Sequence, residues 1–371
     1  MIYLDSAATT LQKPPEVSSA MARAVSFLGS PGRGGHPAAM AASREAYRCR
    51  SLAAELFGVP EPERVVFCMN ATHALNIAIK SLVGKGDRAV ISGLEHNAVL
   101  RPLIAVGAEI AVAAAPPFQP ERQLEAFRRE LTPGTKAAVV NHVSNVFGSV
   151  QPLEEIAGLC RRRGIPLVVD ASQSAGVLPL SLERLGAAFI AMPGHKGLYG
   201  PQGTGLLLCG AEAKPLLEGG SGSDSRNPAM PDLLPDRLEA GTHNMPGIAG
   251  LHAGLRFVCR KTPEAVLQHE KRLLRLAEEL LAPLPGLKLW LADRPEDQTG
   301  VLSFTAEGQD PELTAEMLGE RGVAVRAGLH CAPLAHDTAG SGGTVRLSFS
   351  AFNTEAELRR MARILAECLK T

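Results

Sequence analysis

Between about residue 65 and residue 209, short runs rich in Val, Ile, Leu and Ala alternate with amphipathic stretches. The candidate strands are VVFC, AVIS, EIAVAAA, KAAVVNHVSN, PLVVDAS, AFIAM and TGLLLC. Most are continuous apolar runs, without the apolar–polar alternation of a half-exposed strand. We therefore expect an α/β fold with a mainly parallel central sheet, buried on both faces by helices such as 71–83 and 153–163.

The chain after this region begins with a segment that has neither helical nor strand periodicity. Residues 210–245 are rich in Gly, Ser, Pro and Asp, which indicates a long surface loop of the kind that is usually functional. Helical spacing then predicts helices at 248–260, 265–281, 311–321 and 355–369, with strands near 287–291, 300–305 and 344–349.

These patterns predict two unequal domains. We expect an N-terminal segment at 1–15, a large domain at 16–247, and a smaller C-terminal α/β domain at 248–371. The N-terminal helix could pack with the smaller domain.

Composition narrows the choice of partners. The formal net charge of the 371 residues is +0, and no run of like charges suggests nucleic acid or an anionic membrane. The start of the chain, MIYLDSAATT, has no secretory or transit signal, so we expect a cytoplasmic protein. Its 7 cysteines are scattered and form no CxxC pair, as in a protein with reduced thiols. A small molecule or another protein is the expected partner.

A lysine follows the strand AFIAM, in the glycine-rich stretch AMPGHKGLYGPQGTGLL. At the end of a buried strand, Lys196 would face a cleft and be partly desolvated. Such a lysine can lose its proton near neutral pH and form a Schiff base, which attachment of pyridoxal 5'-phosphate (PLP) requires. An isolated lysine in a turn is more often a surface residue. The sequence lacks a P-loop, because no GxxxxGK is followed by Ser or Thr.

An aspartate ends another buried strand upstream of this lysine, in PLVVDASQSAG. The carboxyl end of a parallel strand faces the ligand crevice, where Asp170 could protonate a pyridine nitrogen. Alone, an Asp in this position is more often a helix cap or a turn former. Together, Lys196 and Asp170 favour a PLP site.

A strand, the turn MNAT and a helix beginning near Ala71 form a third element. Backbone N–H groups at this helix N-terminus, with the Thr72 hydroxyl, could hold a phosphate. Simple capping of the helix by Asn70 or Thr72 is the ordinary alternative.

With these elements in this order, the chain resembles the class V aminotransferase family of fold-type I PLP enzymes, in particular its group II cysteine desulfurases. The resemblance runs from YLDSAATT to AFNTEAEL, essentially the whole chain. It implies that Lys196 forms the Schiff base with PLP, that Asp170 pairs with the pyridinium nitrogen, and that Gln173 hydrogen-bonds the ring hydroxyl. His96, in LEHNAV, would stack on the ring.

The resemblance also implies residues around the phosphate and between subunits. Thr72 and His195 match phosphate ligands, and Asn145 matches an asparagine near the cofactor hydroxyl and the substrate. Thr242, in LEAGTHN, matches a residue that reaches the phosphate of the neighbouring subunit. We therefore expect a homodimer with a shared active site.

Three residues are expected on the substrate side. Arg346, in TVRLSFSAFNT, matches the arginine that binds the substrate carboxylate, a role suited to a planar bidentate donor. A surface or ion-paired arginine is the alternative. Arg33 and His36, in GRGGH, fall where the family has substrate-side residues.

The stretch RAGLHCA matches the setting of the sulfur-accepting cysteine in group II desulfurases, so Cys331 would be the acceptor. The implied reaction converts L-cysteine to L-alanine and leaves a persulfide on Cys331, for iron–sulfur cluster or other sulfur-containing cofactor biosynthesis through a sulfur-acceptor protein. Its thiolate could be favoured by His330 or by nearby cationic groups. The alternatives are an inert buried cysteine, or a zinc site using His330, Cys331 and His336.

Three positions depart from the family pattern. Pro193 stands where many relatives have a serine near the phosphate, Leu329 replaces a histidine before HCA, and His73 replaces an acid. Selenocysteine lyase and class V aminotransferase are the closest alternative activities, and a non-catalytic PLP-fold scaffold is a third.

Overall fold

The computed structural model describes residues 1–32, 34–223 and 225–369. Its largest sheet has the strand order β2-β8-β7-β6-β5-β3-β4, in which only β8 runs antiparallel to its neighbours. The strands are β2 (Val65–Cys68), β3 (Arg88–Ser92), β4 (Glu109–Ala113), β5 (Thr135–Asn141), β6 (Leu167–Asp170), β7 (Phe189–Pro193) and β8 (Gly205–Cys209). Every residue of β6, β7 and β8 is buried, as the continuous apolar runs predict.

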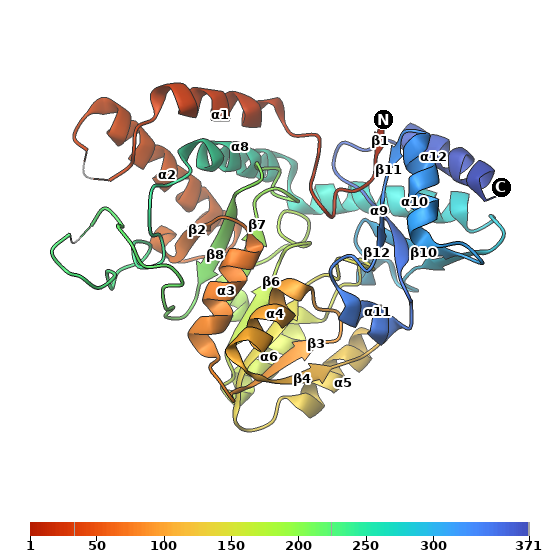
Figure 1. Ribbon diagram of the computed structural model, residues 1–371, viewed down its shortest axis with the longest axis horizontal. Helices are drawn as coiled ribbons and strands as arrows, with labels where there is room; N and C mark the ends of the chain where they lie inside the picture. The colour runs from red at the N-terminus through yellow and green to blue at the C-terminus, as the bar shows by residue number, and fades with distance from the viewer. Residues whose placement is uncertain (33, 224, 370–371) are drawn as a thin grey trace.

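Helices cover both faces of this sheet (Figure 1). One face packs on α2 (Pro37–Leu56), α5 (Pro120–Glu130), α6 (Leu153–Arg163), α7 (Leu182–Leu185) and α8 (Met245–Lys261). The other packs on α3 (Ala71–Leu82) and α4 (Asn97–Val106). The helix α1 (Pro15–Phe27) lies along α8. This arrangement confirms the predicted α/β fold with a mainly parallel central sheet.

The C-terminal part forms a smaller antiparallel sheet with the order β12-β13-β10-β9 (Figure 1). Its elements are β9 (Leu287–Trp290), β10 (Val301–Ala306), β12 (Arg326–Gly328) and β13 (Thr344–Ser348), with α9 (Pro263–Leu281), α10 (Pro311–Glu320), α11 (Pro333–Ala339) and α12 (Glu355–Cys368). The N-terminal strand β1 (Ile2–Tyr3) pairs in parallel with β11 (Val323–Ala324), so the start of the chain belongs to this C-terminal part. Two short 3₁₀ helices lie at Pro62–Arg64 and Pro295–Asp297.

The structure refines two expectations. The strand predicted over KAAVVNHVSN ends at Asn141, because the chain then turns and Val143 pairs with Val150 in an isolated bridge. The described residues of 210–244 form no helix or strand, so this segment is a loop. The proposed division into domains stays a prediction. Within the described ranges, no helix is both long and apolar enough to cross a membrane.

Candidate active site

The candidate lysine lies in a tight turn after β7. A Cβ atom on Gly197 would lie 2.3 Å from the carbonyl oxygen of Ala175, so the turn packs directly against the backbone that follows β6. Burial lowers the pKa of Lys196 to about 8, although the nearby Asp170 carboxylate acts in the opposite direction. The neutral amine is therefore far more accessible near neutral pH than in an ordinary lysine, although the ammonium is still the major form at pH 7.

Asp170 is the last residue of β6 and is buried. Its Oδ1 accepts hydrogen bonds from the backbone N–H and the hydroxyl of Ser172, at 2.9 and 2.5 Å. The Asp170 charge acts on the pKa of both Lys196 and His96, so these three side chains share one environment. The amine and the acid that the sequence predicts around one pyridine ring are brought together.

His96 is the N-cap of α4, where its Nδ1 accepts from the Ala98 N–H at 3.0 Å. Burial is the main cause that lowers the pKa of this ring. A neutral imidazole at the carboxyl edge of β3 is suited to packing against an aromatic ring.

A buried acid beside it, Glu95, was missed in the sequence. Its Oε1 accepts from the Ser92 hydroxyl at 2.5 Å and from the Asn141 N–H at 2.7 Å, which ties the ends of β3 and β5 together. Burial raises the pKa of Glu95 to about 8, and the Asp170 charge adds to the rise. An acid in an apolar stretch directly before His96 was the available signal.

The phosphate-side residues lie near the turn that begins α3. The helix starts at Ala71, and Asn70 caps it by accepting from the His73 N–H at 2.9 Å, as the capping alternative predicts. The Thr72 hydroxyl is exposed and forms no hydrogen bond within the described part of the chain. A Cβ on Gly205 would lie 2.8 Å from the Asn70 backbone, which shows how closely β8 supports this turn.

His195 contacts the N-terminal segment. Its Nδ1 lies 3.0 Å from the Thr9 hydroxyl, and its carbonyl accepts from the Lys13 ammonium at 2.8 Å. Burial first, and then the nearby Lys196 and Lys13 charges, lower the pKa of His195 to about 4. The ring is therefore neutral at physiological pH. The part played by Thr9 and Lys13 was not anticipated.

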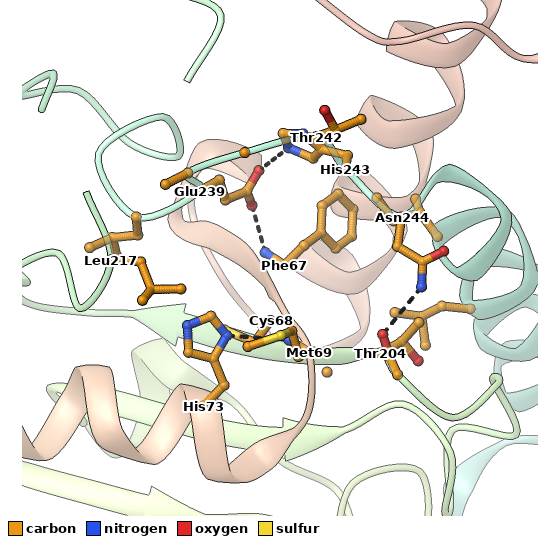
Figure 2. Close-up of a pocket in the computed structure, with 17 residues that line it drawn as sticks. Phe67, Cys68, Met69, His73, Thr204, Leu217, Glu239, Thr242, His243 and Asn244 are labelled. Atoms are coloured by element: carbon orange, nitrogen blue, oxygen red, sulfur yellow. Dashed lines mark hydrogen bonds and ion pairs between the residues drawn. The ribbon is translucent and has the colours of Figure 1, made fainter. Parts of the chain in front are cut away.

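The two other predicted cofactor residues, Gln173 and Thr242, line different cavities. The side-chain amide of Gln173 donates to the Ala7 carbonyl at 3.0 Å, in a cavity of about 30 Å³ that Lys196 also lines. Thr242 instead lines a separate cavity of about 210 Å³ with His73 and Glu239 (Figure 2). Its action on the cofactor of a second subunit stays a prediction.

Arg346 is buried on β13 and belongs to an ion cluster that the sequence did not reveal. Its Nη2 donates to Asp5 at 3.0 Å, and its Nη1 donates to the Asn145 carbonyl at 2.8 Å. Asp5 also binds Arg326, which lies opposite Arg346 on β12, at 2.9 Å. The Nε of Arg346 and the Oδ1 of Asn145 are buried without a hydrogen-bond partner among the described residues. These two atoms can still bind a ligand.

Cys331 is exposed and follows β12, so the alternative of an inert buried cysteine is wrong. Its neighbour His330 is buried, and burial is the main cause that lowers the pKa of that ring to about 3. His330 therefore cannot supply the positive charge that would favour a thiolate. The pKa of Arg326 is raised by its hydrogen bond to Asp5 and, to a smaller extent, by Cys331, so Arg326 is a cationic group near the thiol.

One of the two remaining candidates acts as a helix cap. His36 is exposed and caps α2 by accepting from the Ala39 N–H at 3.4 Å. Arg33 lies outside the described residues. In the described ranges no group of three or more His, Cys, Asp or Glu side chains could hold a metal ion.

The departures from the family pattern have local consequences. Pro193 ends β7 and has no hydroxyl to offer a phosphate, while Leu329 is 48% exposed beside Cys331. The Nδ1 of His73 accepts from the Met69 N–H at 3.3 Å and lines the cavity of Thr242.

The residues present fit PLP. A partly neutral lysine and a carboxylate share one environment, the N-terminus of α3 carries a hydroxyl without a partner among the described residues, and buried polar atoms of Arg346 and Asn145 lack hydrogen-bond partners there. This combination is the donor set that attachment and protonation of the cofactor require.

Comparisons with known proteins agree with this geometry. The family model described as aminotransferase class-V matches residues 2–361. A probable cysteine desulfurase of Methanothermobacter thermautotrophicus is 31% identical over 99% of this chain and 94% of that protein. Another, from Mycolicibacterium paratuberculosis, is 34% identical over 99% of this chain, which spans only 56% of that protein.

Solved structures give the same result. An apo cysteine desulfurase from Thermococcus onnurineus superposes with a TM-score of 0.91 at 29% identity, covering 100% of this chain and 94% of that chain. The S-sulfonic acid form of the cysteine desulfurase CsdA from Escherichia coli superposes with a TM-score of 0.88 at 27% sequence identity. That match covers 99% of this chain and 94% of that chain. The chain therefore belongs to the aminotransferase class-V family.

Proposed function

We propose that this chain is a PLP-dependent cysteine desulfurase, which converts L-cysteine to L-alanine and transfers the sulfur to Cys331. One observation carries the proposal: the exposed Cys331 thiol lies in a turn that is hydrogen-bonded to the substrate side of the site. In that turn the His330 carbonyl accepts from Asn145, and the Asn145 carbonyl accepts from Arg346. A sulfur acceptor is thereby joined to the proposed carboxylate-binding group. The names of the relatives support the same activity.

The residues of the chain have distinct tasks in this proposal. Lys196 carries the cofactor, Asp170 holds a proton on the pyridine nitrogen, and Gln173, Thr72 and His195 hydrogen-bond the cofactor oxygens. Bound PLP supplies an electron-withdrawing ring that stabilises negative charge at the substrate Cα. After substrate binding the Lys196 amine is free to take the Cα proton, because burial keeps its pKa near 8.

Arg346 and Asn145 orient the substrate. The guanidinium binds the carboxylate, and the partnerless Oδ1 of Asn145 can accept from a donor group of the substrate or cofactor. Together they would place the substrate sulfur toward Cys331. The Cys331 thiolate attacks that sulfur: an S–S bond forms, the substrate C–S bond breaks, and its electron pair passes to the carbon that becomes the alanine methyl group. The products are alanine and a Cys331 persulfide, which an acceptor protein or a thiol reduces.

Three further features belong to the proposal. Thr242 would reach the cofactor phosphate of a second subunit, so the enzyme would be a homodimer. The sulfur that the enzyme releases from L-cysteine would be used to build iron–sulfur clusters or other sulfur-containing cofactors in the cytoplasm. Arg33 and His36 would contact the substrate, as the resemblance implies.

The test is to incubate PLP-loaded protein with L-cysteine and a thiol reductant and to measure alanine and sulfide together. We expect equal amounts of both from the wild type, and neither from Lys196→Ala or Cys331→Ala. Keto-acid-dependent amino transfer without sulfide would contradict the proposal and favour an aminotransferase. Activity of Cys331→Ser on L-selenocysteine but not on L-cysteine would show that selenium elimination needs no thiol.

A further inference from the structure

The backbone at the proposed nucleophile has an unusual conformation. His330 and Cys331 have φ angles of 51° and 55°, in the left-handed region that residues with a Cβ rarely occupy. Two such residues in succession persist only where the surrounding contacts enforce the conformation. The contacts that enforce it here can be traced atom by atom.

The backbone of the turn is bound by the large-sheet part of the chain. The Asn145 side-chain amide donates to the His330 carbonyl at 2.9 Å. The backbone N–H of Asn97, at the start of α4, donates to the Cys331 carbonyl at 2.8 Å. Both carbonyls of the strained pair are therefore fixed.

The His330 side chain fixes the same turn to the small sheet. Its ring is buried, and its Nε2 lies 3.1 Å from the Thr344 carbonyl and 3.0 Å from the Thr344 hydroxyl. Because a carbonyl oxygen can only accept, the proton must be on Nε2. The Thr344 hydroxyl then donates to Ser303 at 3.1 Å, and the Ser303 hydroxyl donates to the Val146 carbonyl at 2.6 Å. This series of hydrogen bonds ends at the residue that follows Asn145.

We infer that His330 is a positioning residue, which holds Cys331 in its left-handed conformation through the Nε2–H bond to β13. The ring acts as a neutral donor: burial, and next to it the charge of Arg346, lower its pKa to about 3, with His336 and Arg326 adding to the effect. It therefore takes no part as an acid or a cation at working pH. The inference rests on the proposed role of Cys331 as sulfur acceptor.

The test compares PLP-loaded His330→Gln, which can keep an N–H near the Nε2 position, with His330→Leu, which cannot. His336→Leu is the matched control, because this buried ring stacks on His330 at 5.7 Å and binds Ser341 instead of the turn. Thermal unfolding establishes that each variant is folded. Single-turnover mass spectrometry then measures persulfide on Cys331, and absorbance of the cofactor measures the response to L-cysteine.

We expect His330→Leu to form persulfide about 100-fold more slowly, as small misplacements of reacting groups do, while the absorbance response to L-cysteine is kept. His330→Gln should be rescued to near the wild-type rate with an unchanged pH profile, and His336→Leu should transfer sulfur normally. The inference would be overturned if His330→Leu formed persulfide as fast as wild type. It would also be overturned if His330→Gln were as slow as His330→Leu. Loss of one limb of the pH profile in His330→Gln would do so too, because it would show proton transfer.

A second measurement separates this inference from the proposed function. The alkylation rate of Cys331 by iodoacetamide, followed by peptide mapping, needs neither substrate nor turnover. We expect this rate to change several-fold in His330→Leu and to be preserved in His330→Gln. If wild-type protein forms no persulfide, the proposed function fails. An unchanged alkylation rate in His330→Leu contradicts only the positioning role of His330.

Discussion

Two edges of the molecule meet at the candidate site, and their ionisable groups differ in whether burial makes them neutral or leaves them as paired charges. At the carboxyl edge of the large sheet, burial moves the pKa of Lys196, His195 and Glu95 toward the neutral form. At the β12–β13 edge of the small sheet, burial also lowers the pKa of Arg346, but a guanidinium starts from so high a pKa that it stays charged, and Arg346 and Arg326 share Asp5 as counter-ion.

In the proposed function the two edges have different tasks. Moving a proton at neutral pH requires groups whose pKa lies near that pH, and burial provides them. Binding a carboxylate requires a permanent positive charge, which must be paired if it is to be buried. Variants on the two edges should therefore fail in different ways.

The largest effect is expected on the large-sheet edge. In the proposed function Lys196 holds the cofactor and takes the Cα proton, so Lys196→Ala should lower kcat by about 10⁴-fold. Steady-state sulfide release measures it, and the absorbance of the attached cofactor should disappear. Lys214→Ala, which changes a lysine in the loop after β8, is the control and should keep wild-type kcat.

A smaller effect, in KM, is expected on the other edge. Arg346→Gln removes charge-assisted hydrogen bonds worth about 2 kcal/mol, so KM for L-cysteine should rise roughly 30-fold with a smaller change in kcat. Arg326→Gln, half-exposed on β12, should change KM less. A fall in kcat as large as that of Lys196→Ala would erase the proposed contrast between the edges.

The shared counter-ion should matter mainly for stability. Asp5→Asn leaves two guanidinium groups without a compensating charge, and we expect the free energy of unfolding to fall by about 2 kcal/mol. Denaturant unfolding of the PLP-loaded protein measures it. Asp232→Asn, which removes an exposed pair with Arg237 at 3.8 Å, is the matched control and should cost under about 0.5 kcal/mol.

The last prediction concerns the pH dependence of stability and tests neutrality by burial at a fourth group. Glu270 lines the small cavity that Lys196 also lines, and burial raises its pKa to about 8. Between about pH 5 and pH 8 the unfolded chain has lost this proton and the folded chain keeps it, so wild-type stability falls as pH rises. Glu270→Gln cannot ionise, so its melting temperature relative to wild type should rise across that window.

Above about pH 8 this difference should level off, because folded and unfolded wild type then have the same charge at residue 270. Glu278→Gln, exposed on the same helix, is the control and should show no such trend. A constant difference for Glu270→Gln across the window would mean that its carboxyl is already ionised at pH 5.

Much of the site could be predicted because its main residues follow buried strands. Asp170 ends β6 and Lys196 lies in the turn after β7, and these strands are adjacent and parallel. The carboxyl ends of adjacent parallel strands share one edge, so continuous apolar runs locate both residues. Cys331 was located by the local stretch RAGLHCA instead.

The residues that were missed act across long distances along the chain. Asp5 and Arg346 are separated by 341 positions, and Asp5 lies in a segment without strong periodicity. Glu95 and His330 were visible as residue types, but their ionisation depends on how completely other elements bury them. The role of Thr242 at a second subunit, which the resemblance implies, stays a prediction.

The sequence by itself determined the buried parallel strands, the residues at their ends and the family, because periodicity and short motifs are local properties of a chain. Only the tertiary structure decided which charges are neutralised and which are paired. Burial and ion pairing depend on what lies within a few ångströms in space, and here the first strand of the chain closes against the last part of it.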